Sequence, residues 1–188
     1  DPEHHYDMLV VGSGPSGQRA AIQAAKLRKR VAIIEHEPSL GGVCSNTGTI
    51  PSKSFREAVM YLSGFRERSM YGTAYRVKSQ IRMEDLTYRI ESIVRHENQI
   101  IEHQLHRNRV ELIYGHASFV DSRRLVIEGQ GSITTKTADK IVIAVGTRPA
   151  HPEGFEVDGE KIFDSDHILS LKELPLSLTV VGGGIVCV

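Results

Sequence analysis

The chain alternates between short, continuous apolar runs and longer segments whose apolar residues recur at helical spacing. Met8–Val11 is an apolar run that ends at a glycine, which predicts a buried parallel strand. A helix is expected from about Pro15 to Arg28, where small alanines would let it pack closely on a sheet. Val31–Ile34 predicts a second buried strand, so the three segments form a βαβ unit.

The same kinds of pattern continue along the rest of the chain. Further helices are expected at about Pro51–Arg68 and at Glu84–Arg107, the latter with an apolar stripe near helical spacing. Further strands are expected at Val110–Tyr114, Phe119–Val120, Leu125–Glu128, Ser132–Thr135, Ile141–Ala144 and Leu178–Val181. The second to fourth of these form a small antiparallel meander with a turn at Gly129–Gly131. We therefore predict an α/β fold with a parallel sheet, helices and this meander.

Composition excludes several classes of protein. The 188 residues are 40% hydrophobic, and 23 Lys and Arg balance 23 Asp and Glu, so no basic field would attract nucleic acid or an anionic membrane. The two cysteines, Cys44 and Cys187, fit a reducing compartment, and we expect a cytoplasmic protein. The nine histidines show no ligand spacing with a carboxylate, so no metal site is expected.

The segment Gly12-Ser13-Gly14-Pro15-Ser16-Gly17 has the pattern G-x-G-x-x-G between the predicted strand and helix. The first glycine permits a tight turn, the second lets the backbone approach a pyrophosphate, and the third allows close packing. The start of the helix offers N–H groups and a positive dipole end to phosphates. Glu35 ends the second strand at the distance expected for a carboxylate that binds ribose hydroxyls. Together these features predict a dinucleotide site.

A second motif is more specific. Gly41-Gly42-Val43-Cys44-Ser45-Asn46-Thr47-Gly48-Thr49-Ile50-Pro51-Ser52-Lys53 resembles the G-G-x-C-x-x-x-x-C-I-P-S-K signature of the flavoprotein disulfide reductases. The resemblance covers the whole chain, including segments similar to the family's G-x-A and A-T-G-x-x-P stretches at Arg109–Ala117 and Ile141–Pro149. It implies a Rossmann-like FAD-binding domain at residues 1–150, incomplete at its C-terminal side. It also implies a connection and the first strand of an NAD(P)-binding domain at residues 151–188.

The resemblance also implies which residues bind the cofactors. For FAD these are Gly12, Ser13, Gly14, Pro15, Ser16, Gly17, Glu35, His36, Gly41, Gly42, Val43, Cys44, Thr49, Lys53, His116, Ala117, Ala144, Val145 and Gly146. For NAD(P) they are Gly182 and Gly184, within a stretch where Cys187 takes the third glycine position. Lys53 is implied to lie near the flavin and His36 to line the adenosine pocket. The rest of the nicotinamide domain, the remaining FAD-domain part and the dimerisation domain of family members are not in this sequence.

The chain departs from the family pattern at Thr49, which stands where the second redox cysteine is expected. A hydroxyl cannot form a disulfide, so Cys44 alone cannot accept two electrons as an intramolecular disulfide. The soluble pyridine nucleotide transhydrogenase branch of the family has the same replacement. By that resemblance NADPH and NAD⁺ are the substrates, FAD carries the hydride between them, and the full-length protein is a homo-oligomer. Two smaller departures are Arg28, where a helix-ending glycine is usual, and Val145, where the family has threonine.

Three interpretations stay open at this point. The first is the FAD-binding portion of a transhydrogenase, with Lys53 and Thr49 beside the flavin as the candidate catalytic residues. The second is an NAD(P)H reductase or diaphorase with a non-disulfide acceptor such as a quinone, a metal ion or oxygen. The third is a non-catalytic FAD-binding fragment.

Overall fold

The computed structural model describes residues 5–72, 80–129, 131–150 and 153–184. The chain divides into two compact units. The first consists of Asp1–Asn46 and Val94–Thr147, and the second of Thr47–Ile93 and Arg148–Val188. The predicted domain boundary near residue 150 stays a prediction.

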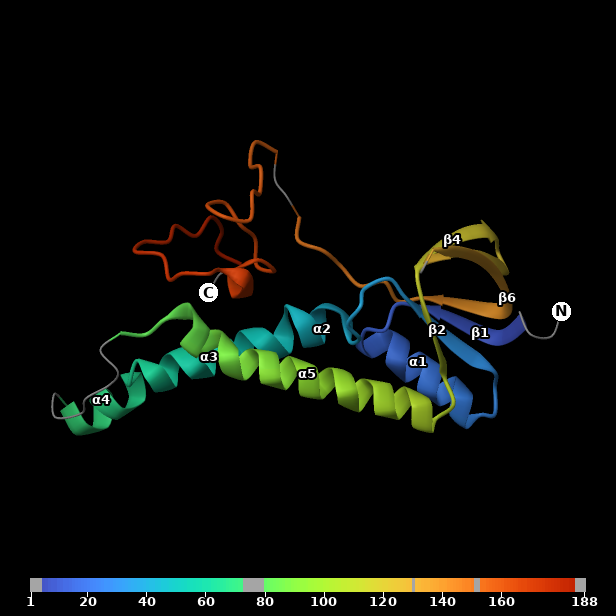
Figure 1. The fold of residues 1–188 in the computed structure, drawn as a ribbon, viewed down its shortest axis with the longest axis horizontal. Coiled ribbons are helices and arrows are strands. Elements are labelled where there is room, and N and C mark those ends of the chain that lie inside the picture. Colours follow the sequence, from blue (N-terminus) through green and yellow to red (C-terminus); the bar gives the residue numbers. More distant parts are fainter. Residues whose placement is uncertain (1–4, 73–79, 130, 151–152, 185–188) are drawn as a thin grey trace. The chain divides into compact units, whose positions relative to one another are not determined.

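The first unit is built on one six-stranded sheet with the order β3-β2-β1-β6-β5-β4 (Figure 1). Its strands are β1 (His5–Val11), β2 (Val31–Glu35), β3 (Glu111–Tyr114), β4 (His116–Asp121), β5 (Arg124–Gly129) and β6 (Ser132–Ile143). Strands β3, β2, β1 and β6 pair in parallel, and β6, β5 and β4 pair antiparallel. The helix α1 (Pro15–Lys26) joins β1 to β2, so the predicted βαβ unit and the α/β fold class are confirmed.

Strand β6 corrects one prediction, because the segments expected as two strands form one. Its first half pairs antiparallel with β5, and from Thr137 onward it pairs in parallel with β1. The residues between the two predicted strands, 136–140, are mostly charged or polar and were not assigned to either strand. They instead continue the strand, since Ala138 is buried and pairs with Tyr6 of β1 while Asp139 and Lys140 remain exposed.

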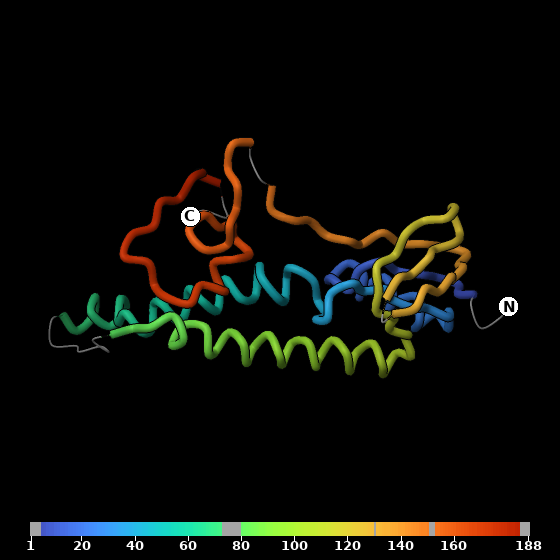
Figure 2. The backbone as a smooth tube through the Cα atoms, turned by 45° about the horizontal axis from the view of Figure 1, so that its top comes forward, coloured from blue at the N-terminus to red at the C-terminus, as the bar shows by residue number. Residues whose placement is uncertain are grey.

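The sheet carries a core on each face. On one face Val10 and Ile33 pack against alanines of α1 and against Ile101 and Leu105 of the helix α5 (Met83–Arg107). On the other face Leu9 and Ile34 pack against Leu125 and Ile127 of β5. The β4–β5 hairpin therefore folds back over β1 and β2, which Figure 2 also shows. Because both faces are covered, β1 and β2 need continuous apolar runs, which is the pattern from which they were predicted.

In the second unit the helix predicted from Pro51 is divided in two. The helix α3 (Thr49–Leu62) stops before Gly64, whose φ of +63° is left-handed, and α4 (Phe65–Tyr71) begins after it. The core of this unit joins α3 to the start of α5 through Ala58, Met83 and Leu86. The short helix α2 (Gly42–Asn46), which precedes α3 in the sequence and belongs to the first unit, was not predicted. Within the residues described, no helix is long and apolar enough to cross a membrane.

The strand predicted at Leu178–Val181 does not form. These residues have no regular secondary structure, and Val181 keeps 71% of its surface exposed. A buried parallel strand requires a hydrogen-bonded neighbour, and no strand of the described residues pairs with this segment. The described part after residue 153 holds one short 3₁₀ helix, Ile168–Ser170. Residues 185–188, which include Cys187, lie outside the described residues.

The C-terminus of α1 shows how the chain accommodates Arg28 in place of glycine. Arg28 has φ +61°, its N–H donates to the carbonyl of Ala25, and the N–H of Lys29 donates to that of Ala24. This is the hydrogen-bond pattern of a Schellman cap. The helix therefore ends in the usual geometry, with a side chain in a conformation that costs L-residues about 1–2 kcal/mol.

We expect Arg28→Gly to raise the free energy of unfolding by about 1 kcal/mol, because glycine adopts this conformation without a Cβ clash. Chemical denaturation of the two proteins measures the difference. Lys26→Gly, two residues earlier at the last helical position, should instead lower stability by about 1 kcal/mol. If Arg28→Gly lowers the free energy of unfolding, the left-handed conformation of Arg28 does not strain this cap.

Candidate functional site

In the glycine-rich turn between β1 and α1, the first and last glycines lie in close contact with backbone carbonyl groups. Gly12 has φ +102°, and its N–H donates to the carbonyl of Ile34 at 2.8 Å. A Cβ on Gly12 would collide with the carbonyl group of Ala144, and one on Gly17 with the carbonyl of Gly12. Both positions therefore require glycine.

The middle glycine, Gly14, has different surroundings. It is the N-cap of α1, Pro15 follows at the first helical position, and within the described chain no side chain caps the helix start. A Cβ on Gly14 would meet no described atom within 4 Å. The first turn of α1 therefore offers uncapped N–H groups and a positive dipole end beside open space, and these features fit a diphosphate.

Ser13 and Glu35 join this turn to the end of β2. The N–H and the hydroxyl of Ser13 both donate to Glu35 Oε2, at 2.9 and 2.6 Å. The N–H groups of His36 and Glu37 donate to Oε1, at 2.8 and 3.0 Å. Ser13 is fully buried and Glu35 is 4% exposed. The carboxylate thus fixes both the glycine turn and the chain reversal after β2.

These hydrogen bonds keep Glu35 ionised although it is buried. Burial raises the pKa of the carboxyl, but the hydrogen bonds from Ser13, Glu37 and His36 outweigh this, so the pKa lies below its ordinary value. Four N–H and O–H donors also occupy the approximately four acceptor positions of a carboxylate. Glu35 is therefore a structural clamp here, and its hydrogen bonding to a ribose stays a prediction.

The segment that opens the second motif lies beside the glycine turn. The N–H of Gly41 donates to the hydroxyl of Ser13 at 3.0 Å, and a Cβ on Gly42 would lie 3.3 Å from the Cα of Gly14. Two asparagines hydrogen-bond to this segment: Asn46, which lies within the second motif, and Asn98, which lies in neither motif. The first unit therefore brings Gly12–Gly17 and Gly41–Gly42 together.

Other predicted residues of the first unit lie at the same edge of the sheet. Ala144 follows β6, and its N–H donates to the carbonyl of Val11 at 2.8 Å. His116 begins β4, and its ring lies edge-on to that of His36 with 6.4 Å between centroids. Val145 and Gly146 follow Ala144, and Val145 is 65% exposed. This is the edge formed by the carboxyl ends of β1, β2 and β6, where α/β sheets bind ligands.

Four other predicted residues belong to the second unit. Thr49 and Lys53 lie on the first turns of α3 and are exposed, and Gly182 and Gly184 lie in the irregular segment after residue 181. Cys44, on α2 of the first unit, is a free thiol among the described residues. Thr47 Oγ1 is buried without a hydrogen-bond partner in the described chain. The cofactor roles of the predicted residues among these, from Cys44 to Gly184, stay predictions, and none was predicted for Thr47.

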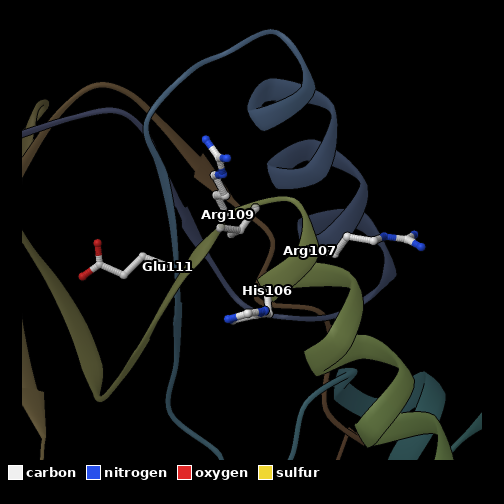
Figure 3. Close-up of a pocket in the computed structure, with 5 residues that line it drawn as sticks. His106, Arg107, Arg109 and Glu111 are labelled. Atoms are coloured by element: carbon white, nitrogen blue, oxygen red, sulfur yellow. The ribbon is translucent and has the colours of Figure 1, made fainter.

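A surface depression elsewhere in the first unit is a poor candidate for a site. It lies at the junction of α5 and β3 and is lined by His106, Arg107, Arg109, Val110 and Glu111. The start of β3 is at the opposite end of the sheet from the glycine turn, because the parallel strands end at that turn. Figure 3 shows that the labelled side chains point in different directions instead of converging. Within the described residues no cluster of His, Cys, Asp or Glu could hold a metal ion.

The glycine turn, the uncapped helix start and the βαβ connection define a dinucleotide-binding domain of the Rossmann-like class. Residues 6–188 match the family described as pyridine nucleotide-disulphide oxidoreductase. The chain belongs to this family. Membership implies binding of FAD and NAD(P).

Relatives of known name agree with this assignment. The chain is 53% identical over 183 residues to a soluble pyridine nucleotide transhydrogenase of Mycobacterium bovis, with 96% of the chain covered. It is 39% identical to another from Aliivibrio fischeri, with 97% covered. The chain spans 39% of the length of each of these relatives.

Solved structures agree on the fold. A Cu(II) complex of RclA, an HOCl-induced flavoprotein disulfide reductase from Escherichia coli, superposes with a TM-score of 0.76 at 24% identity. That match covers 91% of this chain and 35% of RclA. LpdA from Mycobacterium tuberculosis gives a TM-score of 0.76 at 24% identity, over 89% of this chain and 38% of LpdA.

Glu35→Gln should lower the free energy of unfolding by about 1–3 kcal/mol at pH 7, because it removes charge-assisted hydrogen bonds. The pKa is depressed on folding, so the wild-type advantage should be complete above the ordinary value of 4.5 and should shrink as the pH falls below it. Urea unfolding at several pH values between about 3.5 and 7 measures this difference.

Glu37→Gln is a matched control, since the Glu37 side chain is 62% exposed. It should change stability little at any of these pH values. A stability difference for Glu35→Gln that stays constant through pH 4 would contradict a depressed pKa.

Proposed function

We propose that the full-length protein transfers hydride from NADPH to NAD⁺ through bound FAD, and that this chain is its FAD-binding portion. The observation that carries the proposal is Thr49, at the position of the second redox cysteine in an otherwise matching signature. Without that cysteine, electrons have no route through an intramolecular disulfide at this position. The similarity to named transhydrogenases supports the same conclusion.

The residues of the first unit support the binding part of this proposal. The uncapped first turn of α1 would hold the diphosphate of FAD, with Gly14 leaving room for its close approach. The clamp of Ser13 and Glu35 keeps that turn in place, and the edge near His36 and His116 would receive the adenosine end. FAD, when bound, supplies the group that accepts hydride from one nicotinamide and returns it to another.

Two residues of α3 would act next to the flavin ring. Lys53 would place a positive charge there, which favours additional negative charge on the ring electrostatically. Thr49 would supply a hydroxyl that cannot exchange with a disulfide substrate. Cys44 would be a small side chain beside the ring without a redox partner.

The test is steady-state kinetics of the full-length protein. We expect hydride transfer from NADPH to an NAD⁺ analogue and no reduction of lipoamide or glutathione disulfide. On addition of NADPH the flavin absorbance should bleach without the long-wavelength thiolate charge-transfer band that the resemblance implies for disulfide reductases. Rapid reduction of quinones without transfer to the NAD⁺ analogue would favour a diaphorase instead.

Thr49→Cys should restore the C-x-x-x-x-C spacing with Cys44 and create a reducible disulfide. Thiol titration under denaturing conditions, before and after reduction, would count the two additional thiols that appear on reduction. Thr49→Ser retains a hydroxyl and should gain none, so it is the matched control. Disulfide reductase activity in the unmodified protein would refute the proposal.

A further inference from the structure

Asn98, in the middle of α5, lies outside both motifs but hydrogen-bonds to the chain between them. Its Oδ1 accepts the N–H of Leu40 at 2.6 Å. Its Nδ2 donates to Asn46 Oδ1 at 3.1 Å and to the carbonyl of Val94 at 2.9 Å. A carbonyl accepts only and an N–H donates only, so these partners fix which way the Asn98 amide points.

Asn46 completes the arrangement from the other side. Its Nδ2 donates to the carbonyls of Leu40 and Gly42, both at 2.9 Å. Leu40 is 3% exposed, and both its N–H and its carbonyl are therefore bound by the amide pair. With the bond from the Gly41 N–H to Ser13, side chains hold the backbone of three consecutive residues.

The geometry of this segment allows little adjustment. Gly41 and Gly42 have φ +95° and +58°, and a Cβ on Gly41 would lie 2.8 Å from the Cδ1 of Ile101 on α5. Gly42 lies directly beside Gly14, at the start of α1. A shift of Leu40–Gly42 would therefore change the spacing at the place where the diphosphate is proposed to bind.

We propose that Asn98 is a positioning residue for FAD. Together with Asn46 it holds Leu40–Gly42 in place beside the glycine turn. The inference rests on the proposed FAD site and adds a determinant on α5 that neither motif contains. Asn98 acts through the backbone of Leu40 and through Asn46, and contact with the cofactor is not required. Removing it would leave the buried N–H of Leu40 without its acceptor.

The experiment compares Asn98→Ala, Asn46→Ala, the double variant and Asn108→Ala in the full-length protein. Asn108 is a matched control, because it follows α5 and its Nδ2 likewise donates to the carbonyl four residues earlier, that of Gln104. FAD affinity of the apoprotein is measured by flavin fluorescence. Amide hydrogen exchange of the peptide that contains Leu40–Asn46 is measured without FAD.

We expect Asn98→Ala to raise the FAD dissociation constant about tenfold and to accelerate exchange at Leu40–Asn46, while Asn108→Ala changes neither. The double variant should be about as impaired as the worse single variant, since both residues act on one segment. A folded Asn98→Ala protein with wild-type FAD affinity and exchange would overturn the proposal. So would an effect no larger than that of Asn108→Ala.

Asn98→Asp guards against a variant that fails to fold, because it retains the acceptor for Leu40 and loses only the Nδ2 that donates to Asn46 and to the carbonyl of Val94. It should weaken FAD binding less than Asn98→Ala. The exchange measurement also separates this inference from the proposed function. If the wild-type protein binds FAD but transfers no hydride from NADPH to an NAD⁺ analogue, the proposed function fails alone. If Asn98→Ala leaves FAD affinity and exchange at Leu40–Asn46 unchanged, the positioning role fails instead.

Discussion

The buried hydrogen bonds between Ser13 and Glu35 are the contact on which the rest of the candidate site depends. One carboxylate oxygen holds the turn after β1, and the other holds the chain reversal after β2. Neighbouring parallel strands end at the same edge, but their loops take no fixed relation to one another unless something joins them. A buried carboxylate does so only while fully hydrogen-bonded, and here the donors present match its capacity.

The site is then assembled outward from this contact by close backbone approach. Ser13 binds Gly41, Gly42 lies against Gly14, and Gly12 lies against Ala144. Segments far apart in the sequence thus meet through glycines, which leave room for a ligand at Gly14 while packing tightly elsewhere. The arrangement separates two tasks, since side chains hold the loops together and the exposed backbone of α1 remains available to bind.

Much of this could be predicted from the sequence, because the features concerned are local and periodic. The runs at Met8–Val11 and Val31–Ile34 are apolar throughout because both sheet faces are covered, and the motif glycines have spacings that only a tight turn explains. The continuity of β6 could not be predicted, since its polar middle resembles a loop. The strand predicted at Leu178–Val181 was wrong for a different reason. The segment is apolar, but an apolar run forms a strand only when a neighbouring strand pairs with it. The sequence did contain one indication of the role of Asn98. It is a polar residue on the same helix face as the apolar residues Val94, Ile101 and Leu105.

The continuity of β6 limits where residues can be inserted into the chain without disturbing the fold. Thr137 is paired with Arg124 of β5 and with His5 of β1, so the two halves of the strand share a single register. One residue inserted between Ser132 and Ile143 would move the following side chains to the opposite core. It would also shift Ala144 away from Gly12. Insertions at the hairpin tip between Gly129 and Ser132 leave that register intact. Natural or engineered insertions and deletions should therefore occur mainly at this hairpin tip. The tip lies at the start of β6, whereas Ala144 and the candidate site lie at its end.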